Sequence, residues 1–113
     1  MSVNIAHYVI AGVILPADGV EYSKVEKYEI SYWKKPKRGT FGVLYDGMSG
    51  EYTIAGRVMV ATSYDEDYFG DSNTRPIDLT IPEYEIASIK KELKTKLNIY
   101  AKEIKLIAIT HHT

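Results

Sequence analysis

A basic stretch near the middle of the chain holds the strongest candidates for binding chemistry. Its four cationic side chains could hold a phosphate, and the aromatic ring directly before them could stack on a base. The residues are Trp33, Lys34, Lys35, Lys37 and Arg38. The alternative is a solvated hairpin tip whose charges keep the flanking strands from pairing with other chains. We favour the solvated tip for this stretch alone, because base-stacking sites usually have a broader positive surface.

An acidic segment, Asp65 to Asp71, has the carboxylate density of a calcium loop. The register of such a loop fails, because Phe69 occupies the third ligand position and Pro76 stands where the closing Glu belongs. Tyr68 and Phe69 lie inside this polar segment, and exposed rings either fold back on the body or bind a partner. We therefore keep both aromatic residues as candidate partner-binding positions.

The stretch Asp46 to Gly50 contains two glycines, as phosphate-binding loops do, but it lacks the Lys-Ser/Thr ending of such loops. An ordinary hairpin turn explains this stretch.

Three histidines are the remaining candidates for catalysis or ligand binding: His7, His111 and His112. If the first and last strands pair antiparallel, His7 and His111 come to neighbouring rows, where they could share a phosphate or a metal ion.

Established catalytic signatures are absent from the sequence. His111 to Thr113 has the His-x-Thr spacing of one element of two-histidine phosphoesterases, but His7 has no hydroxyl residue in the matching place, so membership in that family is not inferred. The chain also lacks a nucleophile triad pattern, a His-Glu-x-x-His zinc motif and a dinucleotide fingerprint. We expect no cofactor and no resident metal.

Composition bounds the remaining possibilities. A chain of 113 residues with 45% hydrophobic and 26% charged residues is typical of one globular domain, 1–113. The net charge of −1 gives no strong signal for nucleic acid, and the absence of cysteine fits a reducing cytosol. The longest apolar run, Ile5 to Leu15, is too short to cross a membrane. Ten tyrosines against two phenylalanines are the one departure from an average composition, and tyrosine suits both half-buried strands and binding surfaces.

These residues must be positioned by a mostly β structure. The segment Ile5 to Leu15 is apolar on both alternating faces, which predicts a strand covered on both sides. Alternation from Val25 to Trp33 predicts a half-exposed strand. Thr40 to Tyr45 and Glu51 to Thr62 predict a hairpin, in which Tyr52, Ile54, Val58 and Val60 share a face and Gly56 marks a bulge or a close approach.

One helix is expected after a long irregular segment from Ser63 to Leu79. Thr80 and Glu83 match a capping box, so we predict that Thr80 caps the helix. Its apolar stripe comprises Ile86, Ile89, Leu93 and Leu97, opposite Lys90, Lys91, Lys94 and Lys96. A last strand follows over Ile104 to Thr110. The predicted fold is α+β, a mainly antiparallel sheet of about five strands (β-β-β-β-α-β) with the C-terminal helix on one face.

The leading functional hypothesis is a cytoplasmic, non-enzymatic binding protein that occupies a protein partner or a small anionic, nucleotide-like ligand. Phage accessory proteins that inhibit host enzymes or sequester nucleotides are frequently small domains of this style. The surplus of tyrosine and the irregular loop motivate this hypothesis. Two alternatives stay open: a small phosphoesterase or nucleotide hydrolase that uses the C-terminal histidines, and a structural or assembly protein that forms homo-oligomers through its basic tip and acidic loop.

Overall fold

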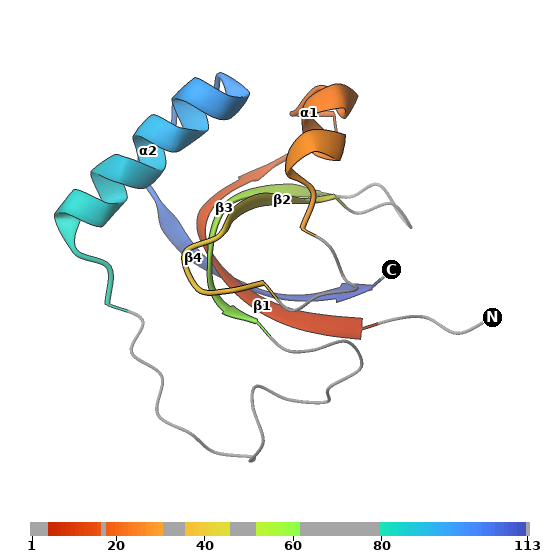
Figure 1. Cartoon of the computed structure of the whole chain (residues 1–113), viewed down its shortest axis with the longest axis horizontal. Coiled ribbons are helices and arrows are strands. Elements are labelled where there is room, and N and C mark those ends of the chain that lie inside the picture. The colour runs from red at the N-terminus through yellow and green to blue at the C-terminus, as the bar shows by residue number, and fades with distance from the viewer. Residues whose placement is uncertain (1–4, 17, 31–35, 46–51, 62–79, 113) are drawn as a thin grey trace, which may run out of the picture.

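The described part of the chain folds into a bent antiparallel sheet and two helices (Figure 1). A computed structural model describes residues 5–16, 18–30, 36–45, 52–61 and 80–112, with the backbone alone at Ile5, His111 and His112. The elements in chain order are β1 (Ile5–Leu15), α1 (Tyr22–Tyr28), β2 (Phe41–Tyr45), β3 (Thr53–Ala61), α2 (Glu83–Leu97) and β4 (Lys105–His112). The α+β class is confirmed. In the described part of the chain the sheet has four strands, one fewer than predicted.

The strand order is β2-β3-β1-β4, and every neighbouring pair is antiparallel. β3 is buried along nearly all of its length, and β1 is buried from Tyr8 to Gly12, as the apolar character of both of its faces predicts, whereas Ile14 near its end is exposed. β2 and β3 pair from Phe41↔Arg57 to Tyr45↔Thr53, which confirms the predicted hairpin pairing. The turn residues of that hairpin, from Asp46 to Gly50, lie outside the described residues.

The sheet bends strongly, and both helices lie outside the bend (Figure 1). The core is therefore divided by the sheet into two clusters. The convex side packs Val25 of α1 and the α2 stripe against the sheet, whereas the concave side is filled by residues such as Tyr8, Ile10 and Leu44. Ile89, Leu93 and Leu97 are the buried residues of α2, which confirms three of the four positions of the predicted stripe, whereas Ile86 is only partly buried.

A register shift in β3 corrects one prediction about its faces. Val9 pairs with Val60 but Ile10 pairs with Val58, so Met59 is an extra residue in β3. Such a bulge moves the following side chain to the other face of the strand. Val60 consequently packs with the convex cluster, and only Tyr52, Ile54 and Val58 of the predicted set share the concave side.

A row of glycines crosses three strands of the sheet. Gly12 of β1 lies opposite Gly56 of β3, which in turn lies opposite Gly42 of β2. A Cβ atom built on Gly12 would be 2.8 Å from the Gly56 Cα, and one on Gly42 would overlap Ile30. Glycine within a strand permits this approach of backbones and the sharp bend that accompanies it. The close approach predicted at Gly56 is confirmed.

The strand predicted from Val25 to Trp33 is wrong over its first residues, which belong to α1. Val25 and Tyr28 are three residues apart and both pack against the convex side of the sheet, a spacing that a helix satisfies and a strand does not. Extended pairing is confined to a parallel bridge of Glu29 with Val43, next to which the Ile30 N–H donates to the Val43 carbonyl at 2.9 Å. Residues 31–33 lie outside the described residues.

The start of α2 also differs from the prediction. Pro82, in extended geometry, is the cap residue, and the cap has no side-chain hydrogen bond, so Thr80 does not form the predicted capping box. Proline is well suited to this end of a helix because the first N–H groups have no intrahelical partner. Neither described helix has the length and apolar character that crossing a membrane requires.

Candidate functional site

The C-terminal half of α2 separates its residues into a buried and a cationic side. Ile89, Leu93 and Leu97 face the sheet, which leaves Lys90, Lys91 and Lys94 beside or away from the buried stripe. Residues three and four positions apart are neighbours on a helix surface, so these three ammonium groups gather within one turn. Lysine chains also cover apolar surface with their stems while their charges stay in water.

A tight reversal after α2 brings a second segment back beside these lysines. Asn98 adopts the left-handed conformation, with φ 57° and ψ 36°. Its N–H donates to the Lys94 carbonyl at 3.0 Å, and the Ile99 N–H donates to the Leu93 carbonyl at 3.1 Å. Asparagine tolerates this conformation better than most residues, and the bonds satisfy carbonyls left open at the helix end. Lys90 Nζ then donates to the Lys102 carbonyl at 2.9 Å, which ties the returning segment to the helix.

Between α2 and the returning segment lies a hollow of about 540 Å³, which we call the lysine groove. It is lined by Lys90, Lys91, Lys94, Ile99, Tyr100, Ala101 and Lys102. The Tyr100 side chain is largely exposed, and Lys94 Nζ is 5.6 Å from the centroid of its ring. The groove thus combines four cations, a partly buried apolar floor and one accessible aromatic ring.

The charge of the lysine groove is uncompensated by its own lining, which includes no Asp or Glu among the described residues. The nearest acidic residues in sequence are engaged elsewhere: Glu92 pairs with Arg57 and Lys96, and Glu103 pairs with Lys105 at 3.2 Å. Like charges held close together repel one another, and a bound anion relieves that repulsion. The arrangement can therefore hold a negatively charged ligand.

A separate ion-pair network fixes α2 on the sheet. Arg57 of β3 donates from Nε to Glu92 Oε1 at 2.7 Å and from a terminal nitrogen to Ser88 Oγ at 2.6 Å. Lys96 Nζ donates to Glu92 Oε2 at 2.7 Å and lies 4.9 Å from the centroid of the Phe41 ring. The charged groups in this network satisfy one another, so we assign it a structural role in positioning the helix that carries the lysine groove.

The Glu92 carboxyl makes this network sensitive to pH. Burial would raise its pKa, but hydrogen bonds from Lys96 and Arg57, together with their charges, lower it below the ordinary value of 4.5. Because the folded-state pKa is depressed, the stabilisation is present above the ordinary pKa and is lost as the pH falls through the lowered one.

We expect Glu92→Gln to reduce the free energy of unfolding by about 1–2 kcal/mol near neutral pH, because two cations lose their charged acceptor. The difference from the wild type should shrink at acidic pH, as the pH falls through the lowered pKa of the wild-type carboxyl. Urea unfolding at both pH values measures this. Glu103→Gln, which removes an exposed ion pair, should cost less than about 0.5 kcal/mol. A Glu92→Gln effect of equal size at both pH values would contradict the assignment.

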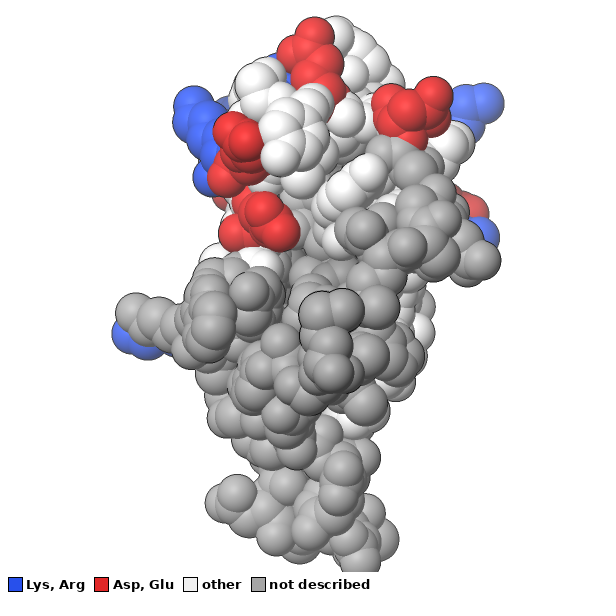
Figure 2. All heavy atoms as spheres, turned by 90° about the vertical axis from the view of Figure 1, so that its right-hand side faces the viewer, with Lys and Arg blue, Asp and Glu red and all other residues white. Residues whose placement is uncertain are grey.

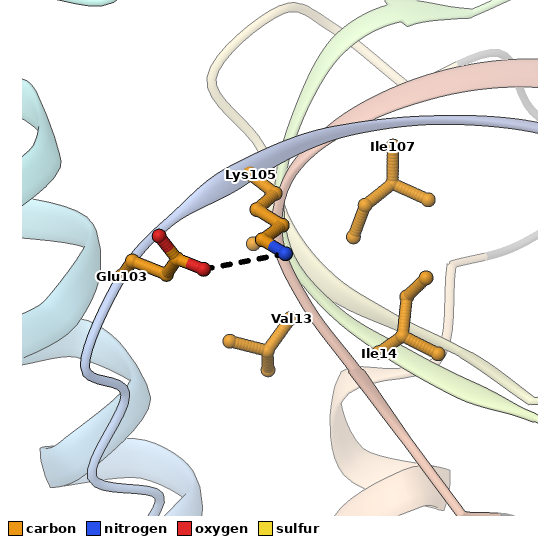
Figure 3. Close-up of a pocket in the computed structure, with 6 residues that line it drawn as sticks. Val13, Ile14, Glu103, Lys105 and Ile107 are labelled. Atoms are coloured by element: carbon orange, nitrogen blue, oxygen red, sulfur yellow. Dashed lines mark ion pairs between the residues drawn. The ribbon is translucent and has the colours of Figure 1, made fainter.

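A second hollow lies at the edge of the sheet, where β1 continues beyond β4 (Figure 3). Its volume is about 250 Å³, and Val13, Ile14 and Ile107 give it an apolar lining beside the Glu103–Lys105 ion pair. It is smaller than most small-molecule pockets, and its charges neutralise each other. We therefore rank it below the lysine groove.

The surface around α1 carries both signs of charge. Figure 2 shows acidic side chains at the upper end of the molecule, where α1 lies, with basic side chains beside them. Glu21, Glu26 and Glu29 are exposed there. Tyr22 is also exposed, and its hydrogen bond with Glu26, reinforced by neighbouring negative charge, raises the pKa of its hydroxyl. Because acidic and basic side chains are mixed around α1, this surface is a weaker candidate for an anionic ligand than the lysine groove.

Most of the binding residues predicted from the sequence lie outside the described residues: Trp33, Lys34, Lys35, Tyr68 and Phe69. Lys37 and Arg38 are described, are exposed at a turn, and do not line the lysine groove. Their part in binding stays a prediction. The stretch Asp65 to Asp71 also lies outside the described residues.

The histidines come together in part as predicted. β1 and β4 pair antiparallel, which places His7 opposite Thr110 and Ala6 opposite His111 in neighbouring rows. His7 Nδ1 lies 3.0 Å from Thr110 Oγ1. Among the described residues there is no group of three or more His, Asp or Glu side chains that could hold a metal ion. The register confirms the predicted neighbouring rows of His7 and His111, and both the shared ligand site and the phosphoesterase activity stay predictions.

Sequence reasoning identified the groove lysines but interpreted them as the solvated side of a helix. It also grouped Lys96 with them, whereas Lys96 turns towards Glu92. The missed partners are Tyr100 and Lys102, which the reversal at Asn98 brings back beside the helix. A residue that tolerates the left-handed conformation, directly after a helix and followed by an aromatic residue and a lysine, was the available signal.

Comparison with protein-family models, with curated proteins and with solved structures found no match for this chain.

Proposed function

We propose that this chain is a small, non-enzymatic binding protein that holds a phosphate-bearing small ligand in the lysine groove. The observation that supports this proposal is the lining of the groove, which has four lysines and no carboxylate among the described residues. Its volume of about 540 Å³ falls within the range of small-molecule sites. A protein of this kind acts by occupancy, since it removes its ligand from solution without transforming it.

Inorganic tripolyphosphate is the first probe, because it carries phosphate charge without any other recognition element. We expect isothermal titration calorimetry to show binding that weakens strongly from about 20 mM to about 200 mM salt, since exposed charges are screened over that range. The double variant Lys91→Gln/Lys94→Gln should weaken binding by about tenfold or more, because hydrogen bonds to charged groups contribute about 1.5 kcal/mol or more each.

The matched control is Lys24→Gln/Lys27→Gln on α1, which removes the same charge outside the groove. It should change the affinity for tripolyphosphate by less than about twofold, the effect of distant, screened charges. Lys37→Gln/Arg38→Gln tests the basic tip in the same assay. Absence of tripolyphosphate binding by the wild type at low salt would refute the proposal, as would an equal loss in the α1 control.

A further inference from the structure

We infer that the ligand of the lysine groove is a free nucleoside triphosphate whose base stacks on Tyr100 and whose phosphates contact Lys91, Lys94 and Lys102. This inference rests on the proposed function and adds the class of ligand. Its starting point is the ring of Tyr100, which is 71% exposed at the rim of a cationic hollow. Tyr22 and Tyr84 are equally exposed, but neither lines the groove.

The surroundings of the Tyr100 ring favour a planar ligand. Lys94 Nζ, 5.6 Å from the ring centroid, is a cation within the range of an attractive contact with the ring. The ring is held by a short segment that the Asn98 reversal and the bond from Lys90 to the Lys102 carbonyl both fix. A tyrosine on a fixed backbone has only two side-chain torsions to order when a base stacks on it, and stacking accepts any base because each has a flat π face.

The number of cations indicates how many phosphates the groove accepts. Four lysines line it, and a nucleoside triphosphate carries a charge of about −4 at neutral pH, whereas a monophosphate carries about −2. The ammonium groups of Lys91 and Lys102 make no ion pair with any residue in the described ranges. A triphosphate therefore balances the charge of the groove, and a monophosphate leaves part of the repulsion in place.

The apolar lining of the groove favours binding of a nucleotide over binding of a bare polyphosphate. Ile99 and Ala101 are partly buried and add apolar surface to the lining of the groove. Tripolyphosphate offers nothing to cover that surface or the ring, whereas a ribose and a base do. A nucleotide also suits a compact hollow better than a long strand, which requires an extended positive track.

The test compares ATP, tripolyphosphate and adenosine by calorimetry on the full chain. We expect ATP to bind about tenfold more tightly than tripolyphosphate, within the range of one base stack. Tyr100→Ala should remove that advantage and leave tripolyphosphate binding unchanged. Tyr100→Phe should retain the advantage, and Tyr84→Ala, which truncates an equally exposed tyrosine of α2, should alter neither ligand.

The outcomes separate this inference from the proposed function. Equal affinities for ATP and tripolyphosphate, both insensitive to Tyr100→Ala, would overturn base stacking and leave the phosphate site standing. Failure of both ligands to bind would overturn both proposals. A single-stranded oligonucleotide that binds more tightly than ATP, with the same dependence on Tyr100, would overturn the assignment to a free nucleotide.

Discussion

Gly12→Ala is expected to destabilise the fold by about 3 kcal/mol, at the upper end of what overpacking usually costs. The new Cβ atom would overlap the Ala55 carbonyl and lie 2.8 Å from the Gly56 Cα. Both neighbours are backbone atoms of the central strand β3, so no side chain can rotate to make room. Relief requires that β1 and β3 move apart, which breaks the antiparallel pairing of the two central strands of the sheet.

Urea unfolding followed by far-ultraviolet circular dichroism measures this loss. Gly39→Ala is the control, because a Cβ there meets no atom within 4 Å and the substitution is strained only by a φ of 91°. That strain should cost about 1–2 kcal/mol. If Gly12→Ala proves no more destabilising than Gly39→Ala, the strands are not as close as the geometry places them. If Gly12→Ala does not fold, Gly39→Ala must still fold for the steric account to hold.

Leu93→Ala is expected to cost about 3 kcal/mol, the middle of the range for truncating a buried leucine. Leu93 is 0% exposed and lies between Ile89 and Leu97 in the stripe that attaches α2 to the convex side of the sheet. Its loss leaves a cavity under the same turn of helix that carries Lys90 and Lys94. The affinity for tripolyphosphate should fall only as far as the folded fraction falls, since no groove contact is removed.

Thermal unfolding with and without tripolyphosphate tests both statements. Tyr84→Ala on the exposed side of the same helix should change stability by less than about 0.5 kcal/mol, the usual range for surface positions. A Leu93→Ala protein as stable as Tyr84→Ala would show that α2 is not attached through this stripe. Recovery of stability at saturating tripolyphosphate is expected, because ligand binding to the folded state shifts the unfolding equilibrium.

The elements predicted well from the sequence are long segments whose apolar residues cover either one face or both faces. The boundaries predicted for β1 match the structure, because eleven largely apolar, mostly β-branched or small residues fit a strand covered on both faces. The stripe of α2 was equally clear, because apolar residues recur at three and four positions over fifteen residues.

Short segments were ambiguous for a physical reason. α1 has only seven residues, and the hydrophobic pattern of so short a segment does not by itself decide between a helix and a strand. Contact of Val25 and Tyr28 with the convex side of the sheet decided in favour of the helix. The bulge at Met59 has no signature in the composition of β3, and it follows from how β3 must bend to stay paired with β1.

In the candidate site, too, the local sequence pattern predicted some features and tertiary contacts decided the others. Local pattern placed Lys90, Lys91 and Lys94 on the polar side of a helix, because periodicity reports which positions of one segment are buried. Periodicity carries no information on which segments meet, so it could not place Tyr100 and Lys102 beside that helix or bring Gly12, Gly56 and Gly42 into one row. Those juxtapositions come from the left-handed turn at Asn98 and from the registers of the paired strands, which depend on contacts between residues distant in sequence.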